Sequence, residues 1–358
     1  MGTSSTETAA DPTLYYKAVG SIFIYFATVI SALVICIART RFSASNAVYI
    51  LIAISSLLTT WYYILSFFQK EYEKFGSNLD RFILESDLFV QAYAMVTNTL
   101  PKWWWSSQLL VLTGTALTCW SVEGQTIRLE TEKINKDTTN PIKKWTPTWW
   151  FVLLGFFGSM SVGGPLFLAQ LDPNPKTRTQ SRTVPTVLAV LIILGEVSVL
   201  ATPFFESMSP AFKWNLVLTH ALFLVPSFLS FNPESQKRFS TFSLPLLYFM
   251  LSIIALLSHA MYTFPFVVSP IMKPILLYRA LWFNHCQTSI SADLVFNNIL
   301  AAFYMIHSSR QIRKPHIGVL LSLLMPVLSV STILPLYLGW KERQLTSGVT
   351  PKDKKKKA

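Results

Sequence analysis

The sequence predicts an all-α integral membrane protein, a polytopic helical bundle of eight or nine transmembrane helices. Two observations carry this prediction. First, 51% of the 358 residues are hydrophobic, only 13% are charged, and the mean hydropathy is +0.42, whereas a soluble domain carries about 25% charged residues. Second, the apolar residues lie in runs of about 20, the length at which a helix crosses a bilayer. This composition excludes a soluble enzyme, a disordered chain and a secreted disulfide scaffold.

The apolar runs give the expected spans in order. They cover residues 18–38, 46–68, 103–122, 148–170, 183–206, 212–231, 242–262, 291–309 and 316–338. Tryptophan clusters at the starts of the third and fourth runs fit an interfacial belt, where the amphipathic ring lies at headgroup depth. Prolines inside several runs predict kinks, which are tolerated in a membrane because neighbouring helices satisfy the freed backbone groups.

Two connections are long enough to have structure of their own. Residues 69–102 predict a partly apolar helix that lies at the membrane face. Residues 263–290 are apolar but are broken by Pro265, Pro270 and Pro274. We expect this second stretch to be re-entrant or interfacial, and it is the reason that the span count is eight or nine.

The charged residues define the two ends of the chain. A polar segment at 1–17 and a basic tail at 341–358 flank the membrane domain at 18–340, and the tail supplies +5 of the net charge of +12. The tail ends in four lysines and Ala358, the pattern of a retrieval signal read from the cytosol, which predicts the endoplasmic reticulum. The alternative is a solvated basic tail. Both interpretations place the C-terminus in the cytosol, and nine spans then place the N-terminus in the lumen.

Ionisable residues at membrane depth are costly and are therefore candidates for function. Glu196 lies in the middle of a predicted span, and His220 and His259 lie inside two others. Glu123 closes the third span and Asp293 opens the eighth. Each also has a structural interpretation: a neutral packing carboxyl, a histidine bonded across helices, or a charge that favours a helix end.

Several reaction classes lose weight because their motifs are missing. The chain has no G-x-S-x-G, H-E-x-x-H, Walker or G-x-G-x-x-G sequence and no paired-aspartate cluster for a magnesium diphosphate. Its three cysteines, Cys36, Cys119 and Cys286, form neither a zinc pattern nor a disulfide framework. We therefore expect no cofactor and no metal. The remaining residues suit acid–base chemistry on an apolar substrate, with aromatic rings that can stabilise a cation.

Four blocks of sequence carry a resemblance. They are Trp61-Tyr62-Tyr63 ahead of ESDLFVQAYAMV, then WWWSSQLLVLTGTALTCWSVEGQTIR, WWFVLLGFFGSMSVGGPLFLAQL and SISADLVFNNILAAFYMI. In these blocks the chain resembles the fungal membrane-bound terpene cyclases of the ascofuranone and ascochlorin type. The resemblance implies an isomerase of fungal meroterpenoid (secondary metabolite) biosynthesis, in which an acid opens the epoxide of a farnesyl chain and a ring closes.

The resemblance also implies site residues. The proton donor is expected at Glu123 or Glu85 first, and at Asp293 or Glu196 second. Substrate contact and cation stabilisation are expected from four residues of the matching blocks, Trp104, Trp105, Gln108 and Tyr93. The chain departs from the family pattern at Tyr93, where a tryptophan is frequent, and in GFFGSMSVGG, where a glutamine often follows the glycine.

Other functions remain open from the sequence. In a transporter or lipid-handling protein, Glu196, His220 and His259 would form a proton or substrate path. In a scaffold for other enzymes, the tail at 341–358 would be the contact surface. The expected partners are a prenylated small molecule, the lipid bilayer and other pathway enzymes of the same membrane. Nucleic acid is not among them, because the cations outside the tail lie mostly in short connections between spans.

Overall fold

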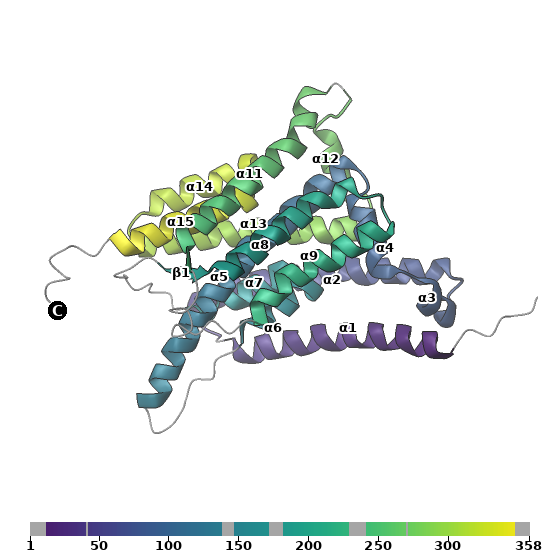
Figure 1. Cartoon of the computed structure of the whole chain (residues 1–358), viewed down its shortest axis with the longest axis horizontal. Helices are drawn as coiled ribbons and strands as arrows, with labels where there is room; N and C mark the ends of the chain where they lie inside the picture. The colour runs from purple at the N-terminus through teal and green to yellow at the C-terminus, as the bar shows by residue number, and fades with distance from the viewer. Residues whose placement is uncertain are drawn as a thin grey trace, which may run out of the picture.

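The computed structural model describes residues 12–40, 42–137, 147–171, 182–228, 241–269 and 271–347. Within these ranges the secondary structure is helical apart from one pair of three-residue strands (Figure 1). The longer helices are α1 (Pro12–Arg39), α2 (Ala47–Lys74), α5 (Leu100–Asp137), α8 (Thr186–Ala201), α9 (Pro210–Phe228), α11 (Leu244–Val268), α13 (His285–Gln311), α14 (Pro315–Leu328) and α15 (Val330–Ser347). The shorter elements are α3 (Leu79–Glu85), α4 (Leu88–Thr97), α6 (Thr148–Leu153), α7 (Met160–Leu168), α12 (Ile275–Leu281), η1 (Ala44–Asn46), η2 (Leu154–Gly158), η3 (Thr202–Phe204), β1 (Thr183–Pro185) and β2 (Thr241–Ser243).

Five helical segments of the described chain are long and apolar enough to cross a membrane. They are α1, α2, α8 with η3, α11 and α13. Their outward side chains include many exposed leucines, isoleucines and phenylalanines, which suits a lipid environment rather than water. The chain is thus consistent with a polytopic helical membrane protein. By length and composition these five helical segments qualify as candidate spans, which is fewer than the predicted eight or nine.

Helix α5 runs through the bundle, and its C-terminal part projects beyond it (Figure 1). It packs against α8, α11, α13 and α15. Its buried side chains include Trp103, Leu112, Leu117 and Trp120, which belong to the main hydrophobic core. Pro101 stands in its first turn, where the missing N–H would have had no partner in the helix.

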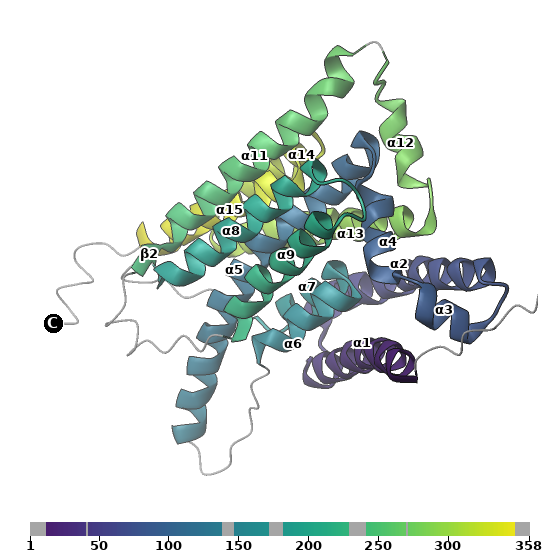
Figure 2. The same cartoon turned by 45° about the vertical axis from the view of Figure 1, so that its right-hand side comes forward.

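The expected span at 148–170 does not cross the bundle as one helix. It breaks at Ser159, whose backbone is extended between η2 and α7. The rings of Phe151 and Phe167 lie 5.5 Å apart, and a Cβ on Gly163 would lie 2.9 Å from the Phe151 carbonyl oxygen. In a straight helix, residues 151 and 163 would be about 18 Å apart. The segment is therefore a helical hairpin with Ser159 and Met160 at its tip, and Figure 2 shows its arms α6 and α7 next to each other.

The expected span at 316–338 is also folded back. Helices α14 and α15 meet at Ser329, which has a φ of +73°. Tyr337 of α15 hydrogen-bonds Ser308 of α13, and a Cβ on Gly318 of α14 would lie 2.2 Å from the neighbouring Ser309 hydroxyl. Both arms thus pack beside the same turn of α13. Helix α15 runs to Ser347, into the predicted tail, and the terminal lysines lie outside the described residues.

The two long connections contain parts of several helices. Residues 263–290 include the end of α11 at Val268, then α12, which packs against α5, and the start of α13 at His285. Whether this stretch is re-entrant or interfacial stays a prediction. In the connection 69–102, α3 is largely exposed, whereas α4 packs against α5 and α13. Helix α4 thus lies inside the bundle, because its apolar face carries Leu88 and Val96 into a hydrophobic cluster.

One end of the bundle is tied together by Arg182. The strands β1 and β2, which directly precede α8 and α11, pair antiparallel at this end. The Arg182 guanidinium donates to Glu342 of α15, with 3.0 Å between Nε and Oε2, and to Glu123 of α5, with 2.6 Å between Nη2 and Oε1. We call this the Arg182 end.

Candidate functional site

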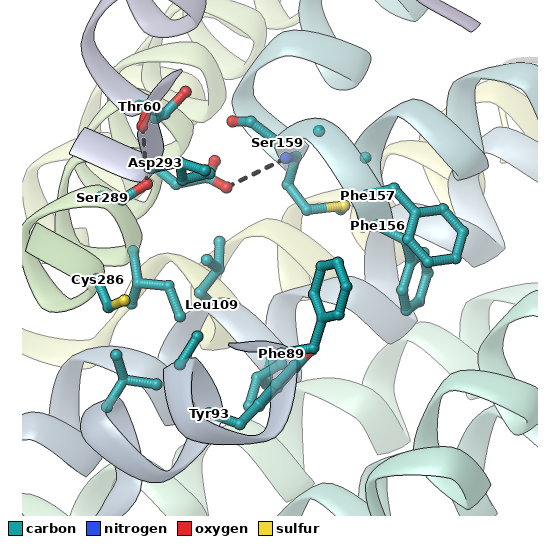
Figure 3. A pocket seen from close by; sticks show the side chains of 18 of the residues that line it. Thr60, Phe89, Tyr93, Leu109, Phe156, Phe157, Ser159, Cys286, Ser289 and Asp293 are labelled. Carbon is teal, nitrogen blue, oxygen red and sulfur yellow. Dashed lines mark hydrogen bonds between the residues drawn. The ribbon is translucent and has the colours of Figure 1, made fainter. Parts of the chain in front are cut away.

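A cavity of about 210 Å³ lies between α2, α4, α5, the α6–α7 hairpin, α9 and α13. Figure 3 shows Asp293 on one side and Tyr93 on the opposite side, with Phe89 and Phe157 along the flank. Most of the lining is apolar, and the polar groups gather at these two sides. An apolar cavity with few polar groups is the usual form of a small-molecule site.

Asp293 is held by the tip of the α6–α7 hairpin. Its Oδ1 accepts from the backbone N–H of Ser161 at 2.8 Å and from Nδ2 of Asn297 at 2.9 Å. Its Oδ2 accepts from the backbone N–H of Met160 at 3.2 Å. These N–H groups are the first two of α7, which have no partner within the helix. The carboxyl therefore caps α7, and the side chains of Ser159 and Ser161 also interact with it.

Hydroxyl groups surround Asp293 on the same side of the cavity. Ser159 and Thr60 line the cavity beside it, and the Ser289 hydroxyl donates to the Thr60 carbonyl at 3.0 Å. The Ser161 hydroxyl bonds both Ser159, at 3.0 Å, and Ser56 of α2. Burial opposes a charged carboxylate here, while the hydrogen bonds from α7 and Asn297 support one. Asp293 is thus a buried carboxyl at which the two effects compete.

Tyr93 and His220 form the other polar side. The Tyr93 hydroxyl lies 2.8 Å from Nε2 of His220, and Nδ1 of His220 lies 2.7 Å from the Leu216 carbonyl oxygen. A carbonyl only accepts, so Nδ1 carries a hydrogen, and in the neutral ring Nε2 accepts from the tyrosine. The lone pairs of the Tyr93 oxygen then remain for a bound molecule. Thr202 and Thr219 add two hydroxyls to the lining nearby.

Aromatic rings form much of the wall between the two polar sides. The Tyr25 and Phe89 rings lie 4.8 Å apart, and the Tyr25 hydroxyl donates to the Phe157 carbonyl at 2.7 Å. Phe156 packs edge-on to His220 at 5.5 Å. Ring faces carry negative quadrupole and attract a cation. A molecule bound in this cavity would therefore lie close to a carboxyl group and to several aromatic rings.

Two of the predicted proton donors lie outside this cavity. Glu85 is exposed on α3 and pairs with Arg81 at 3.1 Å, as the i, i+4 spacing permits. Glu123 lies at the Arg182 end in the ion pair already described. Burial alone would lower the pKa of Arg182, but Glu123 and Glu342 outweigh it and raise that pKa. This cluster acts as a structural tie between α5, α15 and the start of α8.

Glu196 is fully buried, as its mid-span position predicts, but it does not line the cavity either. It lies between α8 and α5, so close to Gly114 that a Cβ there would be 2.0 Å from Oε1. Neither carboxyl oxygen makes a hydrogen bond of ordinary geometry to a described residue.

Three of the predicted substrate-contacting residues do not line the cavity. The Trp104 indole donates to the Thr263 hydroxyl at 2.8 Å, and the Trp105 indole donates to the Leu277 carbonyl at 2.9 Å. Gln108 donates to the carbonyl of Trp104 within α5, one turn earlier. The two indoles hold the start of α5 against α11 and α12. Of the predicted site residues, Asp293 and Tyr93 line the cavity, and the roles of all of them stay predictions.

The sequence did not predict the hairpin tip or the Tyr93–His220 pair. A signal for the tip was present in GFFGSMSVGG, where glycines permit the close approach of α6 and α7. His220 was noted as an intramembrane histidine, but its partner is 127 positions away in the chain. His259 lies elsewhere, bonded to the Val327 carbonyl at 3.1 Å. Among the described residues, no three His, Cys, Asp or Glu side chains gather in a way that holds a metal ion.

Comparison with known families gives one partial match. A family described as a protein of unknown function, DUF2834, matches residues 247–343, from α11 into α15. This range includes Asp293 but covers well under half of the chain. No curated protein and no solved structure matches the chain. The matched family has no assigned activity, so the cyclase resemblance stays a prediction.

Proposed function

We propose that this chain is a membrane-bound terpene cyclase that isomerises an epoxidised, prenylated small molecule within the cavity between Asp293 and Tyr93. The observation that carries the proposal is a buried carboxyl at the edge of an aromatic-walled apolar cavity. An isoprenoid chain partitions into lipid, so a site inside a helical membrane bundle suits it. The resemblance of the sequence blocks supports the same reaction class.

In this proposal Asp293 is the acid. Its carboxyl O–H protonates the epoxide oxygen, the C–O bond opens, and the electrons of a neighbouring double bond close the ring. The ring faces of Phe89, Phe156 and Tyr93 lie along the cavity that would hold the resulting cation. A proton then leaves the cyclised cation for the Tyr93–His220 pair, and the return of that proton to Asp293 restores both groups. One proton is given and one is taken, so the product has the mass of the substrate.

The proposal includes a location and a pathway. The molecule acts in the endoplasmic reticulum with its C-terminus in the cytosol, beside other enzymes of fungal secondary metabolism. It uses no cofactor, because epoxide opening by a carboxyl needs only a proton. The proton donor is Asp293 rather than Glu85 or Glu123, since neither of those two borders the cavity.

The test is cyclisation in yeast microsomes that contain the full chain, with epoxidised farnesyl-phenols as substrates. A product of unchanged mass and altered retention is expected. Asp293→Asn should lower its rate by at least about 100-fold, because a general acid contributes about 10²–10⁴-fold. Glu85→Gln is the matched control and should keep full activity, since Glu85 is exposed and paired with Arg81. Full activity of Asp293→Asn in folded protein would contradict the proposal.

A second candidate is a transporter, which the α6–α7 hairpin favours. Broken helices whose ends meet inside the membrane often form transporter sites. The structure separates the three residues of the expected path: Glu196 faces Gly114, His220 faces Tyr93, and His259 faces Val327. Cysteine scanning of the hairpin tip distinguishes the two functions, because a transporter exposes the tip to water-soluble reagents from both sides of the membrane.

A further inference from the structure

A second, smaller cavity lies behind the tip of the α6–α7 hairpin. It has a volume of about 50 Å³ and is formed by α5, α7, α13 and α15. Met160 is the residue that lines both cavities. Its backbone N–H is bonded to Asp293, while its side chain is buried beside Gly155. The buried side chain of Met160 therefore lies at the boundary between the two cavities, the first of which is also lined by Asp293.

The second cavity is suited to hydrocarbon. Its lining is mostly apolar, and two of its polar residues, Asn297 and Tyr304, already form hydrogen bonds with other residues. Asn297 donates to Asp293, and the Tyr304 hydroxyl accepts from Nζ of Lys341 at 2.9 Å. A molecule bound in this cavity would contact alkyl groups and aromatic rings, and it would not need to form a hydrogen bond.

The small volume of the main cavity is a reason to consider the two cavities together. The main cavity, at about 210 Å³, is smaller than the roughly 300–1,000 Å³ of most ligand pockets. A methionine side chain is unbranched and can turn aside to join neighbouring spaces. Backbone anchoring by Asp293 keeps the hairpin tip in place while the side chain of Met160 moves.

We infer that the second cavity receives the far end of an isoprenoid chain and that Met160 limits the length of chain the protein accepts. The inference rests on the proposed function for the identity of the guest. It assigns a binding subsite and a specificity-determining residue that does not itself act on the reacting atoms. Met160→Ala should join the cavities and admit a chain one isoprene unit longer.

The test is equilibrium binding of two probes, a farnesyl-phenol and a geranylgeranyl-phenol, to the purified full-length chain in nanodiscs. Met160→Ala should raise the affinity ratio of the longer to the shorter probe by at least about tenfold, because one extra methylene in an apolar pocket can be worth that much. Met325→Ala is the matched control: both methionines are 5% exposed, but Met325 lines neither cavity. Its ratio should match that of the native chain.

A second variant tests the subsite from the other side. Gly164→Ala adds a methyl group 3.1 Å from Leu300 and 3.7 Å from Trp120, at the wall of the second cavity alone. In the Met160→Ala background it should reverse the gain for the longer probe and lower the affinity of the longer probe more than that of the shorter one. It also reports on the native chain if Met160→Ala does not fold, since any binding of the longer probe should fall.

The outcomes separate this inference from the proposed function. An unchanged ratio in folded Met160→Ala that still binds the farnesyl probe overturns the role of Met160 and leaves the cyclase proposal intact. A changed ratio without any cyclised product supports the subsite and contradicts the cyclase. Failure of the native chain to bind either probe contradicts both.

Discussion

At the residue scale, the contact between Glu196 and Gly114 shows how a helix interface depends on a missing side chain. The carboxyl of Glu196 occupies the space where any other residue at position 114 would place its Cβ. Because Glu196 is fully buried, it has no free surface toward which it can move. The pair therefore fixes the approach of α8 to α5 immediately behind the cavity wall formed by Thr113.

Gly114→Ala should destabilise the protein by about 1–3 kcal/mol, the usual cost of overpacking a core. Thermal unfolding of the purified chain measures the change. Gly20→Ala is the control, since no atom lies within 4 Å of the added methyl. The double variant Gly114→Ala with Glu196→Ala should recover most of the loss. A double variant as unstable as the single one would show that the clash lies elsewhere.

At this scale the sequence predicts which polar residues are enclosed but not which residues they contact. Glu196, His220 and Asp293 are visible as polar residues in apolar runs, and all three are largely enclosed by the bundle. What each of them faces depends on helices that are far apart in the sequence. Asp293 faces the hairpin tip more than 130 positions away, and no local pattern encodes such a pairing.

At the element scale, the Arg182 cluster joins three segments through one guanidinium. The side chains of Arg182 and Glu342 are 16% and 4% exposed. Removal of the cation leaves two carboxylates close together with little water, and Lys341 is then the nearby cation. Breaking a buried ion pair is far more costly than the loss of an exposed pair.

Arg182→Met should therefore lower the free energy of unfolding by about 3–5 kcal/mol. Chemical denaturation in mild detergent measures it. The comparison variant Arg81→Met breaks the exposed pair with Glu85 and should leave the stability almost unchanged. Equal effects of the two variants would contradict the structural role of the Arg182 end.

The element scale is also where the sequence prediction was wrong. Residues 148–170 and 316–338 have the composition of spans, but each folds back on itself. Hydropathy measures how apolar a segment is and not its direction. The break at Ser159 is stabilised by Asp293, and Ser329 adopts a φ of +73° that its residue type does not suggest.

At the scale of the whole molecule, the outer faces of the long helices are apolar. Leu58 of α2 and Leu257 of α11 are 68% and 65% exposed, although both lie near the middle of candidate spans. In water such surfaces would aggregate, whereas in lipid they are in a matching solvent. The fold class could be predicted from composition because every span must present apolar side chains to the same lipid environment.

Leu257→Arg should lower the amount of folded chain recovered from membranes several-fold. An arginine at the centre of a transmembrane helix costs about 2.5–3.5 kcal/mol on insertion scales. Size-exclusion chromatography of the detergent extract measures the recovery. Leu79→Arg is the control, because Leu79 is also exposed but lies on α3, outside the candidate spans. Equal losses for both variants would contradict a lipid-facing role for Leu257.

The strand pair β1–β2 has a topological consequence. Each strand leads directly into a helix, so α8 and α11 begin at the same end of the bundle, and Figure 1 shows both helices running away from that end in the same direction. The chain between them, which includes α9, must return to that end before α11 starts. Arg182 adds the Glu342 region of α15 to the same end. An experiment that shows on which side of the membrane α15 lies beyond Glu342 therefore also shows from which side α8 and α11 enter the membrane.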